Sequence, residues 1–179
     1  MFSLVSIQVP RRAALLSALF LIPTTIHAQD HTSHAGHPAM AASGDTAFKS
    51  MKERGAKVMG VDQNSSLHHF DDLANGGRIV LERDTTDRAG VTAIRAHMRE
   101  IAAEFAKGDF SAPSAVHATN VPGTATMKAN AARIRYEAVD LPGGAEVRIT
   151  TSDAASTRAV HRFLAYQRKE HRAPGVSMP

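Results

Sequence analysis

The pattern of apolar and polar residues between positions 67 and 105 predicts a strand, a turn, a second strand and a helix. Successive side chains of a strand point to opposite faces of the sheet. His68 therefore shares one face with Phe70, and His69 shares the other face with Leu67. The sequence Asn75-Gly76-Gly77 favours a turn, because these residues tolerate positive φ angles.

An amphipathic helix is predicted from Arg88 to Lys107. Asp87 suits the N-cap position, and Gly108 suits the residue that follows the C-terminus of the helix. The apolar residues of this helix recur at helical spacing and form one stripe: Val91, Ile94, Met98, Ile101 and Phe105. His97 falls beside this stripe, so its ring is expected to point toward the sheet or its margin.

The same strand–strand–helix pattern returns 66 residues later. This offset aligns Phe70 with Tyr136 and Asp87 with Asp153, and it aligns the two apolar stripes. The second stripe contains Val160, Phe163, Leu164 and Gln167. We therefore expect an α+β fold made by a tandem ββα duplication, with one four-stranded antiparallel sheet and two helices packed on one face. The repeat units cover about residues 64–108 and 130–172.

The N-terminal residues have the pattern of an export signal. Arg11 and Arg12 precede an apolar run that ends at Ile22, and Ala28 supplies a small residue at the cleavage position. The run is shorter than the ~20 apolar residues that a bilayer span needs. We therefore expect residues 1–28 to be a signal peptide, the protein to be periplasmic, and the cleaved chain not to insert stably in a membrane. An uncleaved N-terminal anchor is the alternative.

Residues 29–44 are expected to form a flexible tether, because their large apolar side chains are limited to Met40. A single α+β domain then covers residues 45–174 and begins with a short helix from Asp45 to Lys57. The segment from Gly108 to Met127 is expected to be irregular.

Within the tether, three histidines and one methionine recur at every third position: His31, His34, His37 and Met40. Imidazole and thioether groups suit copper, and imidazole alone also suits zinc or nickel, although these residues can equally belong to a passive polar linker.

Composition and charge exclude several classes of function. The chain has no cysteine, which excludes disulfides, thiolate zinc sites and covalent attachment of c-type haem. Signal cleavage would remove Arg11 and Arg12 from the 21 basic residues, leaving 19 against 17 acidic residues and a net charge of +2. These charges are interspersed, so we expect no nucleic-acid partner.

The folded domain supplies further candidate metal ligands. These are His68 or His69 on the first strand, His97 on the helix, His117 in the connecting segment and Met127 as an optional sulfur ligand. In the second repeat, Ile134, Arg135 and Phe163 take the places of His68, His69 and His97, so the fold does not require imidazoles there. A site of three nitrogens with an optional sulfur suits copper, with zinc as the alternative. Neutral imidazole is the binding form, so affinity should fall near the free histidine pKa of ~6.5.

Eight short motifs run through the domain: Met59-Gly60-Val61-Asp62-Gln63, His68-His69-Phe70, Gly76-Gly77, Ile94-Arg95-Ala96-His97, Gly108-Asp109-Phe110, Val121-Pro122-Gly123, Val147-Arg148-Ile149-Thr150 and Phe163-Leu164-Ala165-Tyr166-Gln167. Together they resemble a family of small exported bacterial proteins of unknown function, over about residues 48–172. The resemblance implies export and a His- and Met-containing tether. Some members bear the label aspartate carbamoyltransferase. We do not expect that activity, because this chain lacks the Ser-x-Arg-Thr phosphate loop and the second domain of that enzyme.

The sequence thus predicts a periplasmic metal-binding protein, with copper favoured, that binds, buffers or delivers the ion. One alternative is a small-molecule or haem-binding module with His and Met as axial ligands. Another is an enzyme in which His69 or His97 acts as a general base. No nucleophile elbow, His-Glu-x-x-His pair or phosphate loop is present in the sequence to favour the enzyme. The identity of a periplasmic protein partner stays open.

Overall fold

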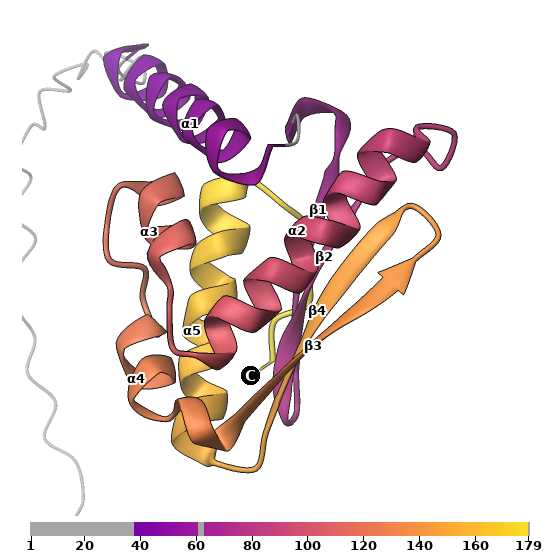
Figure 1. Ribbon diagram of the computed structural model, residues 1–179. Helices are drawn as coiled ribbons and strands as arrows, with labels where there is room; N and C mark the ends of the chain where they lie inside the picture. Colours follow the sequence, from indigo (N-terminus) through magenta and orange to yellow (C-terminus); the bar gives the residue numbers. More distant parts are fainter. Residues whose placement is uncertain (1–37, 61–62, 179) are drawn as a thin grey trace, which may run out of the picture. The chain divides into compact units, whose positions relative to one another are not determined.

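Two antiparallel hairpins form one four-stranded sheet in the computed structural model, which describes residues 38–60 and 63–178. The strands are β1 (Leu67–Leu73), β2 (Gly76–Glu82), β3 (Ile134–Leu141) and β4 (Gly144–Thr151). Their order in the sheet is β1-β2-β4-β3, and every neighbouring pair is antiparallel (Figure 1). The predicted α+β fold with a four-stranded antiparallel sheet is therefore confirmed.

Two long helices follow the two hairpins: α2 (Arg88–Ala106) and α5 (Ala154–His171). Asp87 and Asp153 each accept a hydrogen bond from a backbone N–H of the first turn, at 2.9 and 2.8 Å, so both predicted N-caps are present. Every residue of the predicted apolar stripe on each helix is buried, Gln167 included. In the part of the chain that the structure describes, no helix combines the length and hydropathy of a membrane span.

Each long helix packs mainly on the hairpin of the other repeat. α2 lies against β3 and β4, whereas α5 lies against β1 and β2. The core between the helices and the sheet contains Phe70, Leu81, Ile94, Met98, Phe105, Val147, Ile149, Val160, Phe163 and Leu164. A side chain of β1 on the covered face therefore meets α5, although α2 is the helix that follows β1 in the sequence.

The offset between the two repeats is not constant along the chain. Leu73 pairs with Gly76 across the first turn, and Leu141 pairs with Gly144 across the second turn. Position 73 of the first hairpin therefore corresponds to position 141 of the second, an offset of 68 residues. The helices keep the predicted offset of 66, because the connection from strand to helix is shorter in the second repeat. The prediction of a turn at Asn75-Gly76-Gly77 is wrong in its position, since both glycines belong to β2.

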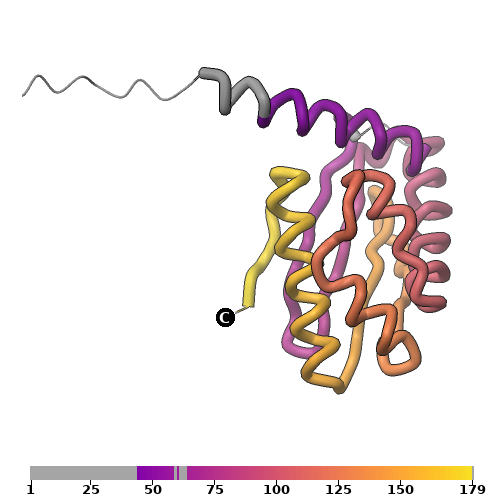
Figure 2. Tube along the Cα trace, turned by 90° about the vertical axis from the view of Figure 1, so that its left-hand side faces the viewer, coloured from indigo at the N-terminus to yellow at the C-terminus, as the bar shows by residue number. Residues whose placement is uncertain are grey.

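Helix α1 (Pro38–Met59) begins before Asp45, where the sequence predicted its start. Pro38 occupies the first helical position, where a missing N–H breaks no hydrogen bond, and the alanines that follow favour a helix. The helix contacts α3 and crosses one end of the helix layer (Figure 2). The signal peptide and most of the predicted tether, residues 1–37, lie outside the described residues and stay predictions.

The segment between the two repeats is helical where an irregular connection was predicted. It contains the short helices α3 (Ser111–His117) and α4 (Thr124–Ala129). Pro113 falls in the first turn of α3, where its missing N–H breaks no helical hydrogen bond, so the proline is compatible with the helix. A 3₁₀ turn precedes each hairpin, η1 (Gln63–Ser65) and η2 (Ala131–Arg133).

Residues 173–178 cover the free edge of β1 (Figure 2). Within this segment the Val176 carbonyl accepts a hydrogen bond of 2.8 Å from the backbone N–H of Asp72. The carboxylate of Asp72 also pairs with the Arg168 guanidinium of α5, at 3.0 Å. An uncovered strand edge offers unpaired backbone groups to other chains, and this segment prevents that. It also ties β1 to the end of α5, where His171 lies.

Candidate histidine pocket

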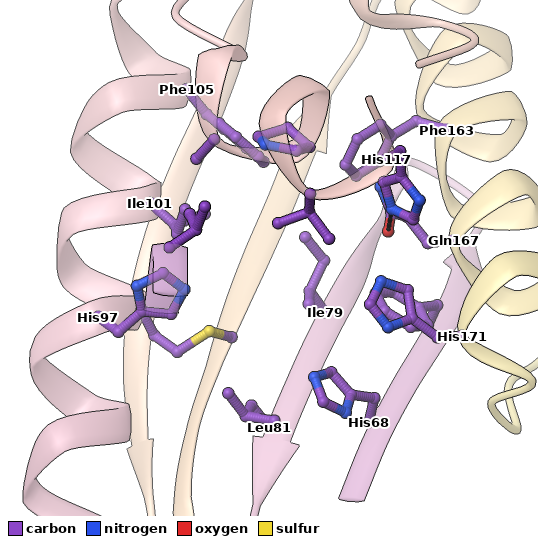
Figure 3. Close-up of a pocket in the computed structure, with 16 residues that line it drawn as sticks. His68, Ile79, Leu81, His97, Ile101, Phe105, His117, Phe163, Gln167 and His171 are labelled. Carbon is purple, nitrogen blue, oxygen red and sulfur yellow. Dashed lines mark hydrogen bonds between the residues drawn. The ribbon is translucent and has the colours of Figure 1, made fainter. Parts of the chain in front are cut away.

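A cavity of about 80 Å³ opens between the sheet and helices α2, α3 and α5. Most of its wall is apolar, with Phe70, Ile79, Leu81, Ile101, Phe105 and Phe163 among the lining residues. Four histidines also line it: His68, His97, His117 and His171 (Figure 3). Among the described residues, no carboxylate lines the cavity. We call this cavity the histidine pocket.

The four imidazoles come from four different elements. His68 lies on the helix-covered face of β1 together with Phe70, as the strand alternation predicted. His97 projects from α2, and Figure 3 shows it across the pocket from the other three rings. His171 belongs to the last turn of α5. His117 ends α3, so the prediction of an irregular connection is wrong at this residue.

The rings of His68, His117 and His171 form a contiguous group. The ring centres of His68 and His171 are 5.2 Å apart, and those of His117 and His171 are 5.1 Å apart. Imidazole nitrogens bind zinc at ~2.0–2.1 Å, so two rings on one tetrahedral ion have centres ~5 Å apart. The ring separations fall near this value, but the contact between His117 and Tyr166 has the same separation of 5.1 Å, so the distance alone does not distinguish a metal site from ring packing. No set of three or more histidine or carboxylate side chains in the described residues already has metal-binding geometry, so binding requires at least one ring to rotate.

Gln167 fixes the orientation of His117. The Nε2 atom of His117 lies 2.9 Å from the Oε1 atom of Gln167. When Nε2–H donates to this oxygen, Nδ1 carries the free lone pair, and a metal-bound histidine usually donates its second N–H in this way. Nδ1 of His117 and Nε2 of His68 are both buried and have no hydrogen-bond partner within the described part of the chain. Buried polar atoms are nearly always paired. Four buried side-chain atoms of the described residues have no partner, and two of them lie in this pocket, whereas Arg83 Nε and the Tyr136 hydroxyl lie outside it.

Burial and mutual repulsion keep these imidazoles neutral. Desolvation, with the nearby His97 and His69, lowers the pKa of His68 to about 4. Desolvation, with His68 and His117, lowers the pKa of His171 to about 3. Burial also lowers the pKa of His97 and of His117. All four rings are therefore in the metal-binding form at neutral pH.

The second repeat has a counterpart of the His68–His171 pair. With an offset of 68 in the hairpins and 66 in the helices, His68 corresponds to Tyr136 and His171 corresponds to Phe105. The rings of Tyr136 and Phe105 meet edge to face, with centres 5.8 Å apart. One half of the fold thus fills this place with aromatic packing that leaves the Tyr136 hydroxyl buried and unpaired, whereas the other half buries two imidazoles at a cost in desolvation. The fold therefore does not require histidines at these two positions.

The remaining predicted ligands lie elsewhere. His69 points to the opposite face of β1 and does not line the pocket. Met127 on α4 is fully buried in the core and does not line the pocket either, whereas Met98 places a thioether side chain in its wall. The side chain of Met40 and three histidines lie outside the described residues: His31, His34 and His37. Their role in binding stays a prediction.

His171 and Gln167 are the residues that the sequence did not predict as part of a site. Gln167 was placed on the buried stripe of its helix, and His171 follows four positions later. Residues four apart lie on the same side of a helix, so this spacing was the available signal.

Comparison with known proteins does not assign the pocket. Searches of protein-family models, curated proteins and solved structures found no match to this chain. The geometry and chemistry of the pocket are therefore the basis for a functional proposal.

Proposed function

We propose that this protein binds one copper ion in the histidine pocket, with His68, His117 and His171 as the ligands. The observation that carries the proposal is the pair of buried, unpaired nitrogens on His68 and His117, whose rings both lie beside His171. Imidazole suits copper, zinc and nickel, so the ligand type alone restricts the ion to late transition metals. Gln167 orients His117 without touching the ion.

The charge of the pocket favours Cu(I) among these ions. Its described lining residues include no carboxylate, and neutral imidazoles leave the charge of the ion uncompensated. The free energy of moving an ion into a low-dielectric site scales with the square of its charge, so a divalent ion costs about four times as much as a monovalent one. The thioether of Met98 in the wall is a soft donor, which also suits Cu(I).

The size of the pocket argues against haem, the alternative that the sequence left open. An engineered protein cavity of about 150 Å³ accommodates benzene. The histidine pocket, at about 80 Å³, is smaller than that. A haem would have to displace core side chains such as Phe105 and Phe163, whereas a metal ion with one small co-ligand needs no such change.

The N-terminal sequence fits the same function. Export to the periplasm, as the signal pattern predicts, would place the copper site outside the cytoplasm. The histidines of the predicted tether would then capture copper and pass it to the pocket: His31, His34 and His37. The protein would act in the binding, buffering or delivery of copper.

The test is an anaerobic titration of the full chain with Cu(I), in competition with a chromophoric chelator, at pH 7.5 and pH 5.5. We expect one tightly bound equivalent at both pH values, because the pKa values of His68 and His171, about 4 and about 3, keep both rings deprotonated. An ordinary histidine with a pKa of ~6.5 is mostly protonated at pH 5.5. The pKa of His117 is also lowered, so the expected loss of affinity moves below the pH ~6.5 of an ordinary histidine site.

The control variant replaces the three tether histidines with alanine in the full chain: His31→Ala, His34→Ala and His37→Ala. The tightly bound equivalent should survive these changes at both pH values. Loss of all tight binding in this variant, or release of the copper already at pH 5.5, would show that the pocket is not the site.

A further inference from the structure

A second cavity adjoins the histidine pocket on the far side of His68 and His171. These two residues line both cavities, so they form the wall between them. The second cavity has a volume of about 250 Å³ and is also lined by Phe48 and Lys52 of α1 and by Arg172 at the end of α5. We call it the outer cavity.

Two cationic side chains, and no carboxylate of the described chain, line the outer cavity. The Nζ atom of Lys52 lies 5.0 Å from the centre of the Phe48 ring, and the guanidinium carbon of Arg172 lies 4.3 Å from it. Lys52 donates to the neutral Asn64 side chain, at 2.7 Å. Arg172 donates to the exposed Asp45 carboxylate at 2.8 Å, and this carboxylate compensates part of the charge of Arg172. Lys52 pairs with no carboxylate of the described residues, so the net charge of these three side chains is positive. The outer cavity therefore presents positive charge beside the wall of the histidine pocket.

This charge is the wrong sign for a metal ion that binds alone. Two cations close to a copper site would repel the ion and weaken its binding. An anion in the outer cavity would reverse this effect, because it would be attracted both by the two cations and by the copper ion. An anion in the outer cavity would therefore compensate the positive charges of Lys52, Arg172 and the copper ion together.

We propose that the outer cavity binds a small carboxylate anion, which contacts Lys52 and Arg172 and compensates the charge of an ion in the histidine pocket. A guanidinium matches the two oxygens of a carboxylate, and an ammonium adds a second charged hydrogen bond. Copper and the anion then increase each other's affinity by the same factor. This coupling rests on the proposed copper function, whereas anion binding to the copper-free protein does not.

Acetate is the probe, and its binding is followed by NMR titration of the full chain at low ionic strength, without metal and with one equivalent of Cu(I). We expect Lys52→Gln to weaken acetate binding about fivefold, because it removes one of the two charges. Lys57→Gln is the matched control. It makes the same charge change on the same helix, at an exposed position that does not line the outer cavity, and it should leave acetate binding unchanged. Copper should raise the acetate affinity of the unmodified protein about fivefold.

The outcomes separate the two proposals. Acetate binding that depends on Lys52 in a protein that fails to bind copper would retain the anion site and refute the copper function. Equal weakening by Lys52→Gln and Lys57→Gln would overturn the anion site, whatever copper does. Binding of inorganic phosphate without binding of acetate would also overturn it as a carboxylate site.

Discussion

Replacing His68 with alanine is expected to weaken Cu(I) binding by at least about 100-fold at pH 7.5. The change removes one of three imidazole ligands, and even the loss of a group that only orients a metal ligand costs about 10–100-fold in affinity. His68 is also one of the two residues with a buried, unpaired imidazole nitrogen in the pocket. Anaerobic chelator competition on the purified variant measures the effect.

His69→Ala is the matched control for this experiment. His69 is the next residue of the same strand, and its side chain points to the opposite face of the sheet. The copper affinity of this variant should equal that of the unmodified protein. Equal loss in the two variants would place the copper outside the pocket. Thermal unfolding, followed by circular dichroism, checks that both variants are folded at the temperature of the binding measurement.

The free energy of unfolding of the metal-free protein is expected to fall by about 3 kcal/mol or more between pH 7.5 and pH 4.5. In the unfolded chain, His68 and His171 take up protons near their ordinary pKa of 6.5, whereas in the folded protein they do so only near pH 4 and pH 3. Between these values the unfolded chain binds more protons, so stability is full above pH 6.5 and decreases as the pH falls. At pH 4.5 each ring taken alone would account for about 2–3 kcal/mol, and the pair accounts for less than the sum because part of the shift is repulsion between the two rings.

The variant with His68→Tyr and His171→Phe isolates this effect. It copies the corresponding pair of the second repeat, Tyr136 and Phe105, and so replaces two buried imidazoles with aromatic rings. Urea unfolding at pH 7.5 and pH 4.5 should show a much smaller loss of stability than in the unmodified protein, since the carboxylates contribute equally to both. An equal loss in the two proteins would mean that the histidine pair does not cause the pH dependence.

The strands and long helices could be predicted from the sequence because local patterns determine them. Strand alternation placed His68 and His69 on opposite faces, and helical spacing with an Asp N-cap located α2 and α5. The local pattern does not determine which hairpin each helix covers. His68 was expected to meet His97 of the following helix, but α5 lies over β1 and brings His171 to it instead.

The correspondence between the repeats was predicted correctly for the helices but not for the hairpins. A single offset of 66 aligned His68 with Ile134, and this hid its true counterpart, Tyr136. The connections from strand to helix differ in length between the two repeats. These connections are irregular segments with no hydrophobic periodicity, so the sequence pattern did not reveal the difference. The short helix α3, which carries His117, was missed because Pro113 marks a break in a sequence pattern but is tolerated in a first helical turn.

The position of copper in a crystal tests the central claim most directly. Crystals of the full chain grown anaerobically with Cu(I) would be measured on both sides of the copper absorption edge. We predict one anomalous difference peak in the histidine pocket, at bonding distance from Nδ1 of His117 and from a ring nitrogen of His68 or His171. Peaks confined to other histidines, such as His69, with none in the pocket, would contradict the proposed function.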